Sequence, residues 1–147
     1  QPQALDLCAL TRQVLQQHES ALVQHGLTVH WLRAAKAPVH GDRDKLALAI
    51  SNVVANAITH APPGSTLELA VERPQPGLVR WSLRDHGAGV PDYAMPRLGE
   101  RFFSTGAAAR GSGLGLAIVR QVLWLHRGEL RFEPAEPGLR VIFVLPG

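Results

Sequence analysis

The most regular pattern of apolar and polar positions in this chain lies between Asp42 and Ala61. When the stretch is wound at about 100° per residue, its apolar residues fall on one stripe, which is typical of an amphipathic helix. The stripe consists of Leu46, Ile50, Val53, Val54, Ala57, Ile58 and Ala61. The opposite side consists of Lys45, Asn52, Asn56, Thr59 and His60. We expect Asp42 to cap this helix at its start, and Pro62 and Pro63 to end it.

Asn52 and Asn56 are four positions apart, so their side chains would lie one turn apart on the same face of this helix. Asparagine is a poor helix former, because its amide competes for backbone hydrogen bonds. One interpretation is a pair of solvated residues on an outer face. The other is a ligand site, and residues further along the chain favour it.

Shorter patterns predict the remaining elements. Helical spacing extends over Cys8–His25, with Gly26 as its stop, and over Leu114–His126. Alternating residues predict strands at 4–7, 27–32, 66–72, 78–84, 129–132 and 139–145, with hairpin turns at 74–77 and 134–138. Pro38–Gly41 is interpreted as a turn that leads into the central helix.

This order of elements favours a two-layer α/β sandwich, because the strands group apart from the helices and form several hairpins. We expect a mixed, mostly antiparallel sheet of about five strands packed on three helices, in a single domain over residues 1–147. Residues 85–112 are rich in Gly, Ala, Ser and Pro and show little periodicity. Loops of that length usually act as lids or binding loops, so we expect a flexible lid here.

The composition is that of a globular protein, with 46% hydrophobic and 18% charged residues. No apolar run is long enough to span a membrane and no signal peptide opens the chain, so we expect it to be soluble. The net charge is +3, but the arginines are scattered and only 5% of the residues are aromatic, which argues against nucleic-acid binding. Cys8 is the single cysteine and the seven histidines lack metal-ligand spacing, so a zinc site is not expected.

Two glycine clusters indicate nucleotide chemistry. At Asp85–Val90, which begins where a predicted strand ends, Gly87 and Gly89 would let the backbone approach a flat ligand while the carboxylate accepts a hydrogen bond. Gly111–Leu116 opens a predicted helix, whose free N–H groups form an anion site. Ordinary turns and helix starts contain such glycines too. Neither cluster has the lysine of a P-loop, and Leu116 stands where a dinucleotide-binding motif needs its third small residue.

Taken in order, these motifs resemble the catalytic and ATP-binding domain of two-component sensor histidine kinases, which has the Bergerat fold. Residues 52–57 resemble the N box of that family, 85–89 the G1 box, 101–103 the F box and 111–116 the G2 box, and 39–46 resemble the lead-in to the N box. The likeness covers essentially the whole chain. The lid and the last helix are most similar to the carbon-source-responsive (CreC-like) branch of proteobacterial sensor kinases.

The resemblance implies ATP and Mg²⁺ as cofactors and roles for individual residues. Asn56 would bind the Mg²⁺ that bridges the phosphates, with Asn52 beside it, and Asp85 would accept the amino proton of adenine. His60 stands where the family has an aromatic residue that packs on adenine. The complete cofactor-binding set that the resemblance implies is Asn52, Asn56, His60, Asp85, Gly87, Gly89, Val90, Phe102, Arg110, Gly111, Ser112, Gly113, Leu114, Gly115 and Leu116.

The chain departs from the family pattern at two places. Thr59 replaces a lysine that often follows the Mg²⁺-binding asparagine by three residues. Ser104 and Thr105 follow the F box, where a basic residue is common, although Phe102 and Phe103 match its lid anchors. The phosphate charge would then be met by Lys45, Arg97, Arg101 or Arg110, and the sequence leaves the choice open.

The function implied by the resemblance is transfer of the γ-phosphate of ATP to a histidine on a separate dimerisation and phosphoacceptor domain. ATPases and serine kinases of the superfamily place a glutamate base where this chain has Asn52, whereas a neutral imidazole needs little help from a base. We therefore expect ATP hydrolysis to be poor. A degenerate nucleotide-binding module that senses ATP or docks a partner is an alternative hypothesis, and a hydrolase is a third that Asn52 disfavours.

The acceptor histidine is expected to lie outside this chain. His18-Glu19 superficially matches the start of the phosphoacceptor motif, but no proline follows at the expected position and the pair lies inside the first predicted helix. We expect a monomeric catalytic fragment from the cytoplasmic part of a bacterial inner-membrane sensor. Its partners would be its own phosphoacceptor helices and a downstream response regulator.

Overall fold

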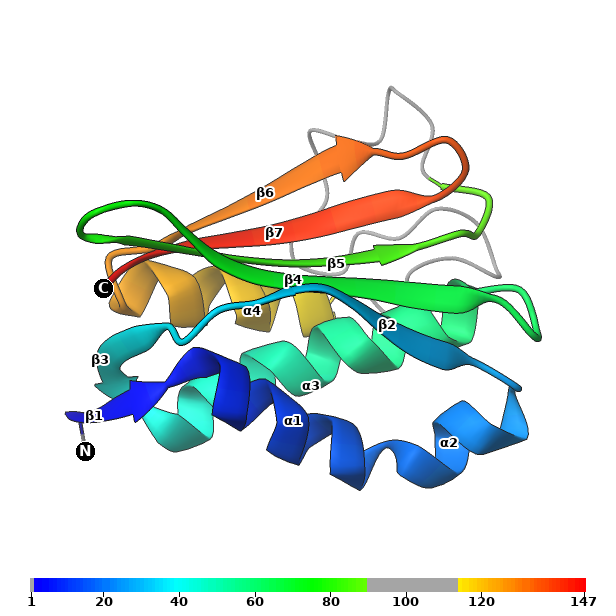
Figure 1. The fold of residues 1–147 in the computed structure, drawn as a ribbon, viewed down its shortest axis with the longest axis horizontal. Helices are drawn as coiled ribbons and strands as arrows, with labels where there is room; N and C mark the ends of the chain where they lie inside the picture. Colours follow the sequence, from blue (N-terminus) through cyan, green and yellow to red (C-terminus); the bar gives the residue numbers. More distant parts are fainter. Residues whose placement is uncertain (1, 90–113) are drawn as a thin grey trace.

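The computed structural model describes residues 2–89 and 114–147. Its elements in chain order are β1 (Pro2–Asp6), α1 (Leu7–Gln17), α2 (Glu19–Gln24), β2 (Thr28–Ala34), β3 (Pro38–Asp42), α3 (Arg43–His60), β4 (Thr66–Gln75), β5 (Leu78–Asp85), α4 (Leu114–Leu125), β6 (Glu129–Pro134) and β7 (Leu139–Pro146). The helices lie together on one face of a five-stranded sheet (Figure 1). The predicted two-layer α/β sandwich is therefore confirmed.

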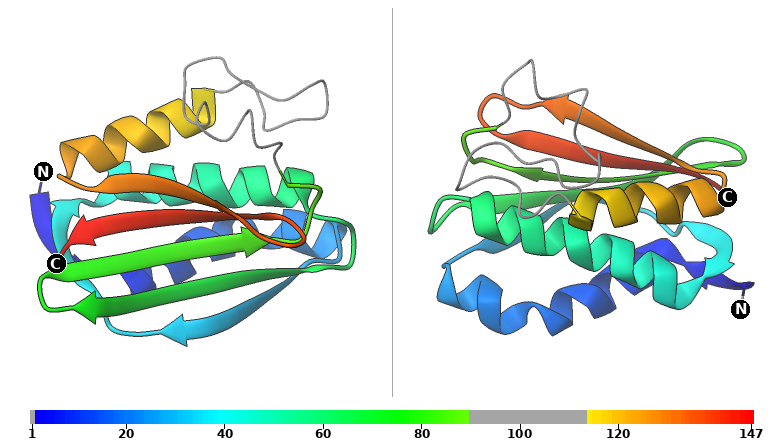
Figure 2. Two further views of the ribbon diagram at one scale, coloured as in Figure 1. Left: turned by 90° about the horizontal axis from the view of Figure 1, so that it is seen from above. Right: turned by 180° about the vertical axis from the view of Figure 1, so that it is seen from behind.

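The large sheet has the strand order β2-β4-β5-β7-β6. β2 and β4 are parallel and the other neighbours are antiparallel, which confirms the expected mixed, mostly antiparallel sheet. A parallel pair needs a crossover, and β3 with α3 supplies the crossover between β2 and β4. Figure 2 shows that α3 lies between α1 and α4 beneath this sheet, so α3 is the central helix of its layer.

Pro38–Gly41 forms a strand where the sequence predicted a turn. This strand, β3, pairs antiparallel with β1 in a separate two-stranded sheet, in which Val39 lies opposite Leu5. The prediction was wrong because strand preference depends strongly on the pairing partner, and β1 lies more than thirty positions earlier in the chain.

The helix predicted over Cys8–His25 is two helices, α1 and α2, joined at His18. The backbone of His18 has φ −101° and ψ 8°, and its N–H donates to the carbonyl of Leu15 at 3.1 Å. The ring Nε2 of His18 lies 2.8 Å from the hydroxyl of Ser51 in α3. The apolar spacing continues through this break, so local periodicity alone could not reveal it. Gly26 follows α2 with φ +65°, the left-handed conformation expected at a helix stop.

The central helix begins and ends where the sequence predicted. The carboxylate of Asp42 accepts a hydrogen bond of 3.0 Å from the backbone N–H of Lys45, as an N-cap does. The helix ends at His60, and Ala61 is its C-cap. Every residue of the predicted apolar stripe is buried.

The inner face of the sheet supplies the other half of the core. Trp81 of β5 and Phe143 of β7 are fully buried and stack with ring centroids 4.4 Å apart. On the outer face, Arg80 and Arg84 of β5 form ion pairs with glutamates of β4. Because side chains alternate along a strand, Trp81, Leu83 and Asp85 all point toward the helices. Asp85, the last of these inward-pointing residues, belongs to the candidate site.

Candidate nucleotide-binding site

Asn56 and Asp85 line the same pocket. It is a narrow slot of about 10 Å³ between α3, the start of α4, the end of β5 and the start of β7. Its lining residues are Val53, Asn56, Ala57, Leu83, Asp85, Leu116, Leu139 and Val141. The pocket is therefore an apolar slot that presents one amide and one carboxylate, a combination suited to orienting a flat heteroaromatic ligand.

The asparagine pair faces α4 and not open solvent. Both Asn52 and Asn56 are half-buried, whereas Lys45 and Thr59, predicted for the same polar side, are exposed. The Nδ2 atom of Asn52 is buried and has no hydrogen-bond partner among the described residues. The interpretation of the pair as solvated outer-face residues is therefore wrong, because α4 packs over that side of α3.

The first turn of α4 lies beside Asn52. A side chain added at Gly115 would place its Cβ 4.0 Å from the amide carbon of Asn52, and Leu116 reaches the pocket itself. The start of a helix presents unpaired backbone N–H groups and a positive dipole end. Together with the buried amide donor of Asn52, these features suit an anionic group at this end of the pocket.

Asp85 ends β5 on the inner face of the sheet and is only 1% exposed. Its Oδ1 accepts a hydrogen bond of 2.9 Å from the backbone N–H of Gly87. This local bond turns the chain away from the strand and holds the carboxylate at the pocket wall. A carboxylate held in this way can accept a hydrogen bond from a ligand in the pocket.

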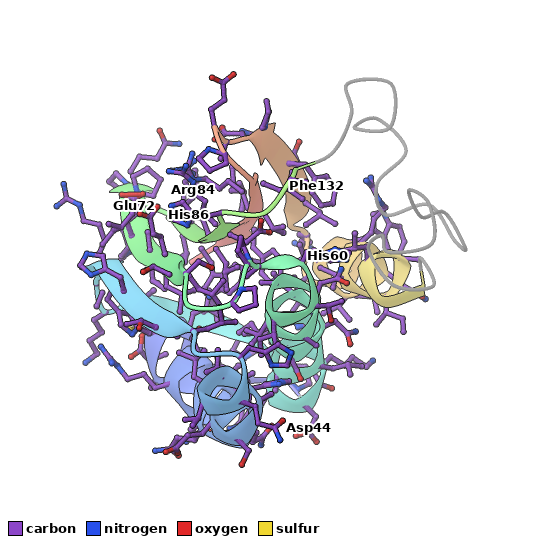
Figure 3. All side chains as sticks on the ribbon, turned by 90° about the vertical axis from the view of Figure 1, so that its right-hand side faces the viewer. Asp44, His60, Glu72, Arg84, His86 and Phe132 are labelled. Atoms are coloured by element: carbon purple, nitrogen blue, oxygen red, sulfur yellow. The ribbon has the colours of Figure 1, made fainter. Side chains whose placement is uncertain are left out.

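His60 closes the end of α3 beside the turn that follows Asp85. A Cβ at Gly87 would collide with the backbone carbonyl of His60, so only glycine permits this close approach. Figure 3 shows the half-buried His60 side chain at the tip of α3, on the side of α4. The end of α3 and the G1 box predicted from sequence are therefore in direct backbone contact.

The predicted site set lacked Val53, Ala57 and Leu83, which line the pocket from α3 and β5, and it lacked every residue of the β6–β7 turn and of β7. Gly138, Leu139 and Val141 come from the β6–β7 turn and from β7, which pairs with β5 so that Leu139 lies opposite Asp85. Strand alternation could have placed Leu139 and Val141 on one face together. The register that brings them to Asp85 depends on long-range pairing, which no local pattern reveals.

Part of the predicted set lies outside the described residues. These residues are Val90, Phe102, Arg110, Gly111, Ser112 and Gly113, together with the alternative cations Arg97 and Arg101. Leu114 begins α4, and Gly89 is the last described residue after β5. Lys45 lies about three helical turns from Asn56, about 16 Å along α3, and lines a separate groove near β1 and β3.

The donor set suits a magnesium ion that arrives with a nucleotide. Within residues 2–89 and 114–147, no group of three or more His, Cys, Asp or Glu side chains could hold a metal ion. The amide oxygen of Asn56 is a hard ligand, and Mg²⁺ usually takes one or two protein ligands together with phosphate oxygens and water. One amide oxygen on the pocket wall would therefore be a sufficient protein ligand for an ion that arrives with phosphate oxygens.

Residues 41–147 match the family described as histidine kinase-, DNA gyrase B- and HSP90-like ATPases. The chain belongs to this family. Membership confirms the family resemblance read from the ordered boxes, and with it the Bergerat fold class. None of the described helices is long and apolar enough to cross a membrane.

Several similar members of this ATPase family are sensor histidine kinases. The chain is 41% identical over 102 residues to the histidine-protein kinase/phosphatase MprB of Mycobacterium sp. (strain KMS), which covers 68% of this chain and 20% of MprB. It is 34% identical over 137 residues to the sensor protein CreC of Escherichia coli (strain K12), which covers 92% of this chain and 28% of CreC. A solved structure of the mycobacterial sensor histidine kinase MprB has a TM-score of 0.88 at 31% identity, over 99% of this chain and 97% of that chain.

The chain is thus a histidine kinase catalytic domain by sequence and by fold. It spans about a fifth of MprB and little more than a quarter of CreC.

Proposed function

We propose that this chain binds ATP with Mg²⁺ and donates the γ-phosphate to a histidine on a separate dimerisation and phosphoacceptor domain. The observation that carries the proposal is the shared pocket of Asn56 and Asp85. These side chains are twenty-nine positions apart in sequence and come from different layers of the fold, yet they line one slot. Family membership supports ATP as its ligand.

In the proposed binding mode, the adenine base lies at the Asp85 end of the site and the phosphates lie at the end formed by Asn52 and α4. Asp85 accepts the amino proton of adenine, and Gly87 and Gly89 let the backbone reach the base. His60 packs near the base in place of an aromatic residue. The amide donor of Asn52 and the first turn of α4 face the phosphates, since an unpaired buried donor gains most from an anionic acceptor.

Asn56 holds the magnesium ion in this proposal. The ion, when bound with the nucleotide, neutralises phosphate charge during transfer. Asn56, four residues before the end of α3, would contribute one oxygen, and the phosphates would contribute others. Asn56 would therefore be the residue of this chain that holds the ion at the pocket wall.

The proposed reaction is attack of a neutral imidazole nitrogen on the γ-phosphorus. A nitrogen–phosphorus bond forms while the bond from the γ-phosphorus to its bridging oxygen breaks, and ADP leaves with that electron pair. The imidazole lone pair is available near neutral pH, so the nucleophile does not first have to lose a proton to a base. Asn52 is neutral and cannot activate water, which is consistent with a kinase that hydrolyses ATP slowly.

The acceptor histidine lies on another part of the full-length protein in this proposal. The chain would act as a monomeric fragment of the cytoplasmic side of a bacterial inner-membrane sensor. Its partners would be its own phosphoacceptor helices and then a response regulator. The small share of MprB and CreC that the chain covers leaves room for such parts.

A thermal-shift titration tests nucleotide binding directly. A saturating Mg²⁺–ATP analogue should raise the melting temperature by roughly 5 °C, because it binds only the native state. Asn56→Ala and Asp85→Ala should largely abolish the rise. Asp44→Ala is the matched control, because Asp44 is exposed at the far end of α3 (Figure 3).

A phosphotransfer assay then separates the three functional hypotheses. The chain is mixed with radiolabelled ATP and the dimerisation and phosphoacceptor fragment of a relative such as CreC. Label on the acceptor histidine supports the kinase. Binding without transfer to any such fragment would favour a nucleotide-sensing module, and steady phosphate release by the chain alone would favour a hydrolase.

A further inference from the structure

Gly138 lies directly against the backbone of Asp85. It is buried, has φ +105°, and is the last residue of the β6–β7 turn, which we define as residues 135–138. A Cβ added at Gly138 would collide with the carbonyl oxygen of Asp85 and would lie 2.7 Å from its carbonyl carbon and 3.1 Å from the Cα of His86. These neighbours are backbone atoms, so a rotating side chain cannot relieve the collision.

The same turn also contacts the chain on both sides of Asp85. Before it, the guanidinium Nη2 of Arg84 donates a hydrogen bond of 3.0 Å to the carbonyl of Pro137. After it, a Cβ at Gly89 would lie 2.9 Å from the carbonyl oxygen of Gly138. The backbone N–H of Ala135 donates to that oxygen at 3.0 Å, which keeps the turn compact. The β6–β7 turn therefore contacts the chain at Arg84, Asp85, His86 and Gly89.

We propose that Gly138 is a positioning residue that sets the distance between the Asp85 carboxylate and the purine edge, and so determines the preference for adenine over a 6-oxo purine. The inference rests on the proposed function. Because Gly138 has no side chain, the backbone of the β6–β7 turn can lie in contact with the carbonyl of Asp85. In this position of the backbone, the Asp85 carboxylate lines the pocket. An added methyl group moves the two backbones apart, and Asp85 moves with its own backbone.

The physical consequence is selective for the base. The charged hydrogen bond from a 6-amino group to Asp85 weakens steeply when the carboxylate is displaced. A 6-oxo purine presents an acceptor to the same carboxylate and gains nothing from the wild-type position. Displacement of Asp85 therefore reduces affinity for ADP more than affinity for inosine diphosphate. General loss of stability would reduce both affinities together.

The test measures the dissociation constants of ADP and inosine diphosphate by calorimetry, well below the melting temperature. We expect Gly138→Ala to reduce the preference for ADP by about tenfold, the effect of losing one hydrogen bond to a charged group. Gly77→Ala is the matched control. Gly77 lies in the β4–β5 turn with a similar φ of +82°, and an added Cβ there meets no atom within 4 Å. Its substitution introduces the backbone strain without the contact and should leave the preference unchanged.

A second pair of variants tests the same contact without strain at a glycine. Arg84→Ala removes the hydrogen bond to Pro137 and should reduce the preference by roughly threefold. Arg80→Ala is its control, because Arg80 lies on the same face of β5 and pairs with Glu72 and Glu133 instead of the turn. This pair carries the test if Gly138→Ala does not fold.

The outcomes separate this inference from the proposed function. Wild-type protein that binds ADP no better than inosine diphosphate contradicts the adenine role of Asp85, and with it the role of Gly138. Wild-type protein that prefers ADP, with folded Gly138→Ala or Arg84→Ala retaining the full preference, overturns the positioning role alone.

Discussion

The indole N–H of Trp81 in β5 donates a hydrogen bond of 3.0 Å to the hydroxyl of Thr11 in α1. That hydroxyl in turn donates to the carbonyl of Leu7 at 2.8 Å, and both side chains are fully buried. The first helix is thereby attached to the centre of the sheet, where Trp81 stacks on Phe143. Each polar group of this buried chain has a partner, as buried polar groups generally require.

Thr11→Val should lower the free energy of unfolding by about 1–3 kcal/mol. Valine keeps the shape of threonine but leaves the indole N–H of Trp81 unpaired in the core. Thr11→Ser keeps the hydroxyl and should retain more of the stability. Urea denaturation monitored by tryptophan fluorescence measures both. Equal stability of Thr11→Val and wild type would show that the bond contributes nothing net.

His18 should make stability depend on pH. Burial lowers the pKa of His18 in the folded chain below its ordinary value of 6.5. The unfolded chain then binds a proton more readily, so stability falls as the pH is lowered from above 6.5 to below the folded pKa. His18→Gln should flatten this part of the profile. Denaturation midpoints between pH 5 and 8 test the difference, and identical slopes for the two proteins would contradict it.

His126 connects the end of α4 to the start of α3. Its Nδ1–H donates to the carbonyl of Val122 at 2.7 Å, and its Nε2 accepts from the backbone N–H of Asp42 at 3.0 Å. His126→Phe keeps an aromatic ring but removes the acceptor, so we expect a loss of about 1 kcal/mol in stability. His25→Phe is the control, because exposed His25 also bonds a carbonyl one helical turn earlier. Denaturant titration should show little change for the control.

Asn52→Glu should convert part of the proposed kinase chemistry into hydrolysis. The position is half-buried beside the first turn of α4, where a carboxylate could take a proton from water. A well-placed general base increases a reaction rate by about 10²–10⁴-fold. We expect a smaller rise in phosphate release, of at least about tenfold, because no other group among the described residues of the site is placed to hold the attacking water. Asn52→Gln keeps the length without the base and should not show the rise. A continuous phosphate-release assay on the isolated chain compares the three proteins.

The local sequence pattern predicted α3 correctly because the residues that start the helix, end it and form its apolar stripe all lie in or next to the helix. Asp42 caps it, Pro62 follows it, and its apolar stripe is buried as the 3.6-residue period predicts. Local pattern failed at His18, where α1 and α2 separate, and at β3, which pairs with β1. Both failures involve partners distant in sequence, and such contacts override local preference.

For the site, the residue types and their order along the chain predict a nucleotide ligand. The polar groups that a nucleotide needs are the side chains of Asn52, Asn56 and Asp85, and the glycines after Asp85 let the backbone approach the ligand. The sequence by itself thus determined the family, the central helix and which groups are available to a ligand. Only the tertiary structure decided that Asn56 and Asp85 share one slot and that Gly138 supports its wall. The physical reason is that the distance between two side chains depends on strand register and helix packing, which are settled by the whole core and not by either segment alone.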